Sequence, residues 1–128
     1  MLTLGWNDFE QAVETLVSRC SEQDFAGVYG IPRGGLVLAV VLSHRLELPL
    51  LLEPRPGCLV VDDVYETGQT LAPYRNLEGA RVWVWVSKVE PQWWDAALVS
   101  ASREWIVFPW ENAAAAVADE QQYRASRA

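Results

Sequence analysis

The sequence predicts an α/β protein with a Rossmann-like, largely parallel sheet of about five strands flanked by helices. Three observations support this fold class. Short apolar segments alternate along the chain with segments of helical periodicity, as expected when helices connect parallel strands. These apolar segments are continuous, which is typical of strands buried on both faces. Two loops rich in glycine and polar residues each follow a predicted strand and precede a predicted helix.

The first predicted helix begins near Asn7, whose side chain can cap it, with Glu10 three residues later as in a capping box. Apolar residues then recur at a spacing that puts them on one face of a helix of about four turns. This stripe consists of Phe9, Ala12, Val13, Leu16, Val17 and Cys20. We therefore expect the helix to pack one face against a core.

The other predicted elements follow in a regular order. Apolar segments predict strands at 25–31, 48–52, 58–61 and 82–86, and shorter ones at 98–100 and 105–108. Helices are predicted at 36–46, 70–77 and 111–124. The second of these has Pro73 in its first turn, where the missing N–H is tolerated. Ligands of such sheets bind beyond the carboxyl ends of the strands, so we expect ligand-binding residues in the loops that follow the strands.

The composition favours one folded domain that spans residues 1–128. Hydrophobic residues make up 51% of the chain, which is ample for a packed core and excludes a largely disordered protein. The longest apolar run, 36–42, is far below the roughly 20 residues that a membrane helix needs. Cys20 and Cys58 lack a metal-binding spacing, so we expect both to pack as small apolar residues in a cytoplasmic protein.

The charge balance limits the class of partner. Lys and Arg number 10 against 17 Asp and Glu, which gives a net charge of −7. Nucleic acids and anionic membranes are bound through clustered positive charge, so neither is expected as a partner. A small anionic ligand is compatible with this balance where a local site supplies a positive field.

The first of the two loops, residues 30–35, reads Gly-Ile-Pro-Arg-Gly-Gly. Its glycines let the backbone approach a ligand, and the predicted helix after it presents the positive end of its dipole. Arg33 adds a rigid fork of donors that suits phosphate. A tight strand-to-helix turn with a solvated arginine explains the same residues equally well. This loop alone therefore leaves both interpretations open.

The second loop, residues 62–70, is more specific. Asp62 and Asp63 are predicted to end a buried strand, where two adjacent anions are costly unless hydroxyl groups or a cation partner them. Sugar hydroxyls and Mg²⁺ would supply such partners. Thr67, Gly68 and Thr70 bring hydroxyls and backbone N–H groups to the start of the predicted helix, a natural phosphate cradle. Together these groups suit a ribose 5-phosphate, while a capped helix after an acidic turn is the alternative.

Residues 60–70 resemble the phosphoribosyl pyrophosphate signature of type I phosphoribosyltransferases. From about 27 to 111 the chain is similar to the bacterial xanthine-guanine and related purine enzymes of that family. The resemblance implies an enzyme of nucleotide salvage that transfers the phosphoribosyl group of phosphoribosyl pyrophosphate to a 6-oxopurine and releases pyrophosphate. It also implies Mg²⁺ as cofactor, a homodimer, and a small hood over about 88–111.

The resemblance assigns roles to residues of both loops. Arg33, Gly34 and Gly35 match the family's pyrophosphate loop, which often contains a cis peptide bond. Asp62 and Asp63 match the acidic pair that holds the ribose hydroxyls and Mg²⁺. The resemblance implies that the 5-phosphate binds to the turn of Glu66, Thr67, Gly68, Gln69 and Thr70. Glu66 stands where the family usually has an aspartate near the imidazole nitrogen of the base, so Glu66 and Arg33 are the implied catalytic residues.

The base side of the implied site lies later in the chain. Lys88 matches the lysine that such enzymes place against the exocyclic oxygen of a 6-oxopurine. Trp105 would stack on the purine and the backbone of Ile106 would read its edge, although Trp105 taken alone is typical of a core residue. Glu111 follows Pro109-Trp110 and is a weaker candidate for a second Mg²⁺, with helix capping as the alternative.

One departure from the family leaves a second function open. The family's long flexible loop, which closes over the reacting carbon, is replaced here by the short, proline-containing connection 53–57. Trp93 and Trp94 could cover the site instead, form a subunit contact, or pack over the sheet edge. The alternative function is a non-catalytic protein of the same fold that binds phosphoribosyl pyrophosphate or a nucleotide as a regulator.

Overall fold

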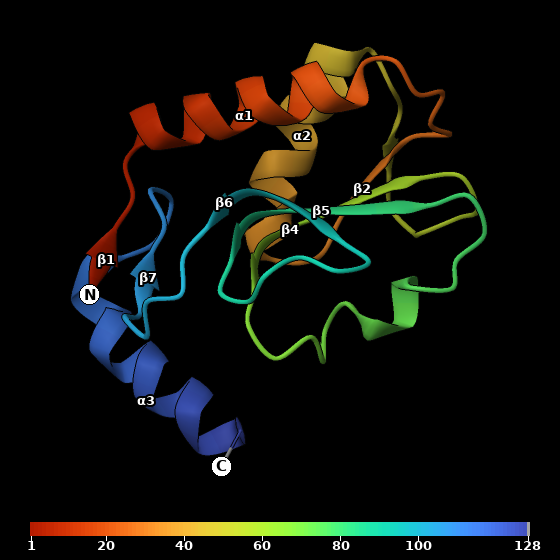
Figure 1. Ribbon diagram of the computed structural model, residues 1–128. Coiled ribbons are helices and arrows are strands. Elements are labelled where there is room, and N and C mark those ends of the chain that lie inside the picture. Colours follow the sequence, from red (N-terminus) through yellow and green to blue (C-terminus); the bar gives the residue numbers. More distant parts are fainter. Residues whose placement is uncertain (128) are drawn as a thin grey trace. The chain divides into compact units, whose positions relative to one another are not determined.

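The computed structural model describes residues 1–127. The chain forms two compact units, one of Ala12–Ser102 and one of Met1–Gln11 with Arg103–Ala128. The larger unit holds a five-stranded sheet in the order β3-β2-β4-β5-β6, and every neighbouring pair is parallel. The predicted parallel α/β class is thereby confirmed, and Figure 1 shows the strands running side by side.

The strands are β2 (Val28–Gly30), β3 (Leu50–Leu51), β4 (Leu59–Tyr65), β5 (Arg81–Ser87) and β6 (Asp95–Val99). The central strands β4 and β5 are the longest, and most of their residues are apolar and buried, as expected of strands packed on both faces. The predicted strands at 25–31 and 48–52 shorten to three and two residues. β4 instead runs past the predicted end at Val61 to Tyr65, because β5 pairs with it as far as Ser87.

Two helices accompany the sheet, α1 (Trp6–Cys20) and α2 (Gly34–Leu46). α1 follows the predicted stripe, of which every member is buried except the half-buried Val17. α2 packs on β2 and β4, where a Cβ at Gly30 would overlap the side chain of Ala39. Side chains alternate along a strand, so Tyr29 and Ile31 point away from α2.

The sheet face opposite α2 carries a second apolar cluster, which includes Ile31, Cys58, Val60, Leu71, Val82, Val84 and Trp94. The expected α-helix at 70–77 does not form there, and the segment contains only the 3-10 turn η1 (Ala72–Tyr74), with Pro73 near its start. Leu71 and Leu77 are drawn onto the cluster, which holds the chain in an irregular path instead of an α-helix. Both cysteines are buried and free, as expected.

The smaller unit is organised around a two-stranded parallel pairing of β1 (Leu2–Thr3) with β7 (Ile106–Val107). The ring of Trp110 stacks on Phe108 at 5.4 Å and meets the edge of Phe9 at 5.8 Å. The predicted helix at 111–124 divides into η2 (Ala113–Ala115), capped by Asn112, and α3 (Ala116–Arg127).

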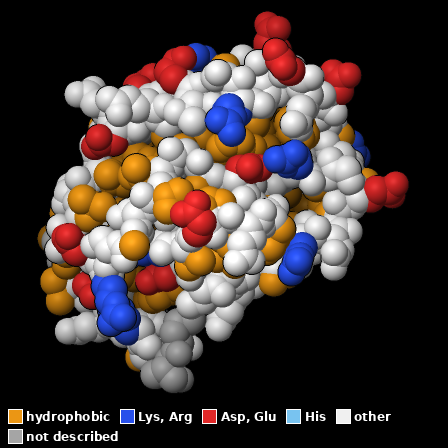
Figure 2. Space-filling view, viewed as in Figure 1, with side chains coloured by type: hydrophobic (Ala, Val, Ile, Leu, Met, Phe, Trp, Pro, Cys, Tyr) orange, Lys and Arg blue, Asp and Glu red, His pale blue; other side chains and the backbone are white. Residues whose placement is uncertain are grey.

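The surface charges are dispersed on the face shown in Figure 2, where Lys and Arg side chains lie singly among acidic and apolar ones. That face therefore carries no extended field of one sign. None of the helices in residues 1–127 combines the length and the apolar composition needed to cross a membrane.

The packing of α2 gives a test with a matched control in the same helix. Leu38 is fully buried, whereas Leu36 is 40% exposed. We expect Leu38→Ala to lower the free energy of unfolding by about 2–5 kcal/mol, because a cavity is left behind. Leu36→Ala should lower it by less than about 1 kcal/mol. Urea denaturation measures both, and equal losses would contradict the described packing.

Candidate active site

The carboxyl end of β2 lies beside the middle of β4, and this brings the first loop close to Asp62 and Asp63. Gly30 is in register with Val61, and the N–H of Ile31 donates to the Val61 carbonyl at 3.0 Å. A Cβ at Gly35 would overlap that same carbonyl and would lie 3.1 Å from the Cα of Asp62. Only glycine lets the first loop approach the acidic end of β4 this closely.

The first loop leads directly into α2. The peptide bond between Pro32 and Arg33 is cis, and Arg33 occupies the N-cap position with an exposed side chain. A Cβ at Gly34 would overlap the carboxyl group of Asp63, so that group lies beside the first turn of α2. A helix N-terminus favours negative charge, so this place suits an acidic side chain or an anionic ligand.

The acidic pair does not end β4 but lies within it, contrary to the sequence-based expectation. Asp62 is only 7% exposed and Asp63 is half-buried. The N–H of Asp63 donates to Oδ1 of Asp62 at 2.8 Å. Burial, and next the charge of Asp63, raise the pKa of Asp62 from 3.8 to about 8. The pair therefore favours one proton at neutral pH, which limits the repulsion between two closely placed carboxyl groups.

The turn at residues 66–70 follows β4 directly. Gly68 has a φ of +81°, and its carbonyl accepts the N–H of Ala72 at 3.0 Å. Thr67, Gln69 and Thr70 are exposed, whereas Glu66 is half-buried. Since an α-helix does not follow, no helix dipole supports this turn, which corrects the expected helix N-terminus. A phosphate would depend on the hydroxyls and N–H groups of the turn itself.

Lys88 is brought to the same edge by β5. Its backbone N–H donates to the Tyr65 carbonyl at 2.9 Å, one residue beyond the pairing of Tyr65 with Ser87. Three adjacent strands thus gather Arg33 to Gly35, residues 62–70 and Lys88 at one end of the sheet in the larger unit.

The remaining predicted site residues belong to the smaller unit. The Trp105 ring lies 5.3 Å from that of Tyr123 in α3. Ile106 is buried and in β7, where the carbonyls of its two neighbours accept the N–H groups of Leu2 and Leu4. Its own N–H and C=O therefore point away from β1. Oε1 of Glu111 accepts the Phe108 N–H at 2.8 Å, which closes a turn and does not cap a helix.

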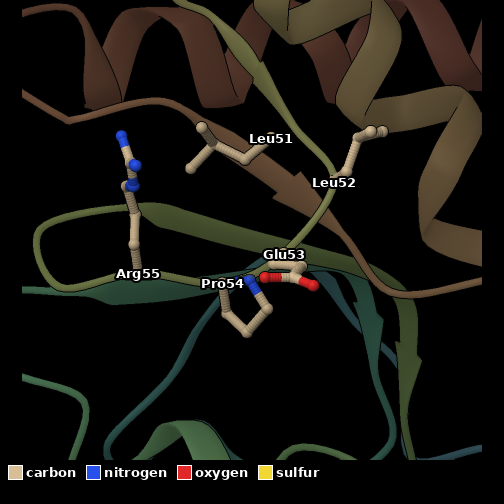
Figure 3. A pocket seen from close by; sticks show the side chains of 5 residues that line it. All are labelled: Leu51, Leu52, Glu53, Pro54 and Arg55. Atoms are coloured by element: carbon tan, nitrogen blue, oxygen red, sulfur yellow. The ribbon is translucent and has the colours of Figure 1, made fainter.

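Two features of the larger unit bear on the missing flexible loop. Trp94 is buried in the cluster opposite α2 and thus serves as a core residue and not as a cover, while Trp93 is half-buried. The short connection after β3 borders an open cavity of about 400 Å³, which is lined by Leu51, Leu52, Glu53, Pro54 and Arg55. In Figure 3 the charged groups of Glu53 and Arg55 point in different directions, so they do not converge on one ligand.

Sequence reasoning assigned no role to Tyr65, although it lies between the acidic pair and the turn. Its ring stacks on Trp94 with centroids 3.6 Å apart and planes 10° from parallel. The sequence offers one indication of such a role, because Tyr65 is an aromatic residue directly before the turn that is predicted to bind ligand. Its packing partner, which lies far away in the sequence, could not be read from the residues.

The chain is similar to curated proteins named xanthine-guanine phosphoribosyltransferase. The one from Chromohalobacter salexigens is 26% identical over 140 residues, which cover 90% of this chain and 86% of the relative. The crystal structure of a purine phosphoribosyltransferase from Pyrococcus horikoshii matches with a TM-score of 0.72 and 26% identity over 87% of this chain and 94% of its own. A xanthine-guanine-hypoxanthine phosphoribosyltransferase from Helicobacter pylori, with a TM-score of 0.71, 18% identity and coverages of 97% and 98%, shows the fold alone. No protein-family model matches the chain.

The parallel sheet, with its acidic strand beside a glycine loop, has the fold of the phosphoribosyltransferases. The chain is similar in sequence to type I phosphoribosyltransferases, and its named relatives are enzymes of the xanthine-guanine kind. The resemblance carried by residues 60–70 is thereby confirmed.

The raised pKa of Asp62 predicts how stability depends on pH. The folded protein keeps a proton on this carboxyl group to about pH 8, whereas the ordinary pKa is 3.8. The contribution of this carboxyl group to the free energy of unfolding is therefore fully present in acid, and it is lost as the pH rises towards the folded-state pKa. Between about pH 5 and about pH 8, the free energy of unfolding of Asp62→Asn relative to that of the wild type should rise by at least about 1 kcal/mol. A shift of one pKa unit is worth about 1.4 kcal/mol.

Denaturation in urea at both pH values measures this gain. Asp24→Asn is the control, because Asp24 is exposed and its substitution should leave the pH dependence unchanged. A constant difference between Asp62→Asn and the wild type at the two pH values would show that Asp62 titrates normally.

Proposed function

We propose that this protein is a purine phosphoribosyltransferase that joins a 6-oxopurine to phosphoribosyl pyrophosphate and releases pyrophosphate. The observation that carries the proposal is the close packing of the Arg33–Gly35 loop on the acidic part of β4. One region of the larger unit thereby offers donors for a diphosphate, acceptors for sugar hydroxyls and a turn for a monophosphate. Phosphoribosyl pyrophosphate contains these three groups within a single molecule.

The sugar phosphate would be held by residues of β4 and the turn after it. Asp62 and Asp63 accept hydrogen bonds from the ribose hydroxyls, and residues 66–70 surround the 5-phosphate with exposed hydroxyls and backbone N–H groups. Arg33, Gly34 and Gly35 bind the pyrophosphate at the N-terminus of α2, where the helix dipole favours anions.

Mg²⁺ fits this donor set. Asp63 lies where the pyrophosphate would arrive, and burial together with the charge of Asp63 raises the pKa of Asp62. Among residues 1–127 no three His, Cys, Asp or Glu gather into a metal cage. Mg²⁺ is commonly held by one or two carboxylates together with substrate phosphates, and Asp62 and Asp63 would supply the former. When bound, the ion neutralises charge on the leaving pyrophosphate; a second ion at Glu111 is the weaker proposal.

Lys88 would bind the exocyclic oxygen of the base, and Trp105 would stack on its ring. The N–H and C=O of Ile106 point away from β1 and would read the edge of the purine. These roles, like the hood over about 88–111, are what the family resemblance implies. The homodimer and the cytoplasmic location also stay predictions.

Catalysis would come from positioning and charge. The bond between the anomeric carbon and the pyrophosphate oxygen breaks as the bond to the purine nitrogen forms, through an oxocarbenium-like sugar. Arg33 stabilises the negative charge that collects on the departing pyrophosphate. Glu66 accepts the proton that the base nitrogen loses. A covalent enzyme intermediate is not needed, because holding both reactants in line accelerates the transfer.

A second candidate is a non-catalytic protein that binds phosphoribosyl pyrophosphate or a nucleotide. The observation that favours it is the connection between β3 and β4, which holds two prolines and leaves Leu52 90% exposed. Such a short, stiff segment has little reach with which to exclude water from a reactive sugar.

An activity assay separates the two candidates. We expect nucleotide to form when the protein is mixed with Mg²⁺, phosphoribosyl pyrophosphate and guanine, xanthine or hypoxanthine. Chromatography detects the product. Tight binding of the donor in calorimetry with no product at high protein concentration would favour the regulator, and absence of both would remove both candidates.

The double variant Asp62→Asn with Asp63→Asn tests the site itself. Hydrogen bonds to charged groups are worth about 1.5–3 kcal/mol each, so affinity for phosphoribosyl pyrophosphate should fall about 100-fold or more. Calorimetry measures the affinity, and Asp24→Asn should bind like the wild type. Unchanged donor binding by a folded double variant would mean that the site lies elsewhere.

A further inference from the structure

Tyr65 is the last residue of β4 and is held firmly on one side of its ring. It stacks on Trp94, whose side chain is 3% exposed and whose Nε1 donates to Oγ of Ser87 at 3.1 Å. The ring of Trp93 meets Trp94 edge-on at 5.4 Å and Tyr65 at 6.4 Å. Such aromatic pairs contribute about 0.5–1.5 kcal/mol beyond burial, so the tyrosine ring has one favoured place.

The hydroxyl end of the same ring lies against the turn at 66–70. A Cβ at Gly68 would overlap the Tyr65 hydroxyl and would lie 2.8 Å from Cζ of the ring. The backbone of Gly68 therefore rests on the tyrosine, with no room for a side chain between them. The φ of Gly68 is +81°, a conformation that only glycine adopts easily. The Tyr65 ring packs against the turn in this conformation.

The backbone of Tyr65 connects the turn to the lysine at the end of β5. Its carbonyl accepts the Lys88 N–H at 2.9 Å, and Tyr65 is in register with Ser87, which also binds Trp94. One residue thus contacts the turn through its hydroxyl, the core through its ring and the Lys88 segment through its carbonyl. All these residues belong to the larger unit.

We propose that Tyr65 is a positioning residue, which shapes the turn at 66–70 before the 5-phosphate arrives and fixes it relative to Lys88. This inference rests on the proposed function, since it takes the turn as the phosphate site. No α-helix follows this turn, so its order depends on its own hydrogen bonds and on its contact with Tyr65. A turn ordered in advance binds more tightly, because less conformational entropy is lost on binding.

Three variants test the role. Tyr65→Leu removes the stack and the hydroxyl, and Tyr65→Phe keeps the stack. Tyr29→Leu is the matched control, because Tyr29 packs on the same cluster but its ring neighbour is Tyr74, 6.0 Å away. We expect hydrogen exchange of the N–H groups of 66–70 to speed up in ligand-free Tyr65→Leu, to change little in Tyr65→Phe, and to stay at the wild-type rate in Tyr29→Leu.

Affinities for guanosine monophosphate and guanosine, which differ by the phosphate, complete the experiment. In Tyr65→Leu the monophosphate should bind about tenfold more weakly while guanosine is unaffected, and Tyr65→Phe should restore most of the difference. Wild-type exchange at 66–70 in a folded Tyr65→Leu, or equal weakening of both ligands, would overturn the proposal. If the wild type binds no nucleotide, the proposed function fails, and hydrogen exchange alone decides whether Tyr65 orders the turn.

Discussion

The parallel pairing of β2 with β4 is the constraint on which the candidate site depends. It sets Gly30 opposite Val61, so the loop that enters α2 leaves the sheet beside the acidic part of β4. The absence of a side chain at Gly35 then allows the helix to start against the Val61 carbonyl. If the register of β2 and β4 were shifted by one residue, the glycine loop and the carboxyl groups would no longer share a site.

The electrostatics of this site follow from that packing. Asp63 lies at the positive end of α2 and gains from its dipole, whereas Asp62 is buried and has a raised pKa. Two acids placed so close are unfavourable for folding alone, and they suit a ligand that brings hydroxyl groups and a cation. Ligand binding thus explains why the two acids lie so close together. In the free protein, the neutral form of Asp62 weakens the repulsion between them.

The sequence predicted those features that depend on local pattern. The stripe from Phe9 to Cys20 matched α1, and the continuous apolar segments matched the parallel strands, because burial on one helix face or on both sheet faces leaves a direct mark on residue type. The failures depended on distant partners. β4 extends past Val61 because β5 pairs with it, residues 70–77 lose their α-helix to packing of Leu71 and Leu77, and the role of Tyr65 follows from Trp94. No local pattern carries such information.

A crystal structure with phosphoribosyl pyrophosphate and Mg²⁺ bound tests the central claim most directly. The account predicts the 5-phosphate at residues 66–70, the ribose hydroxyls at Asp62 and Asp63, and the pyrophosphate at the start of α2. A donor molecule found in the cavity beside Arg55, or anywhere away from the ends of β2 and β4, would contradict it.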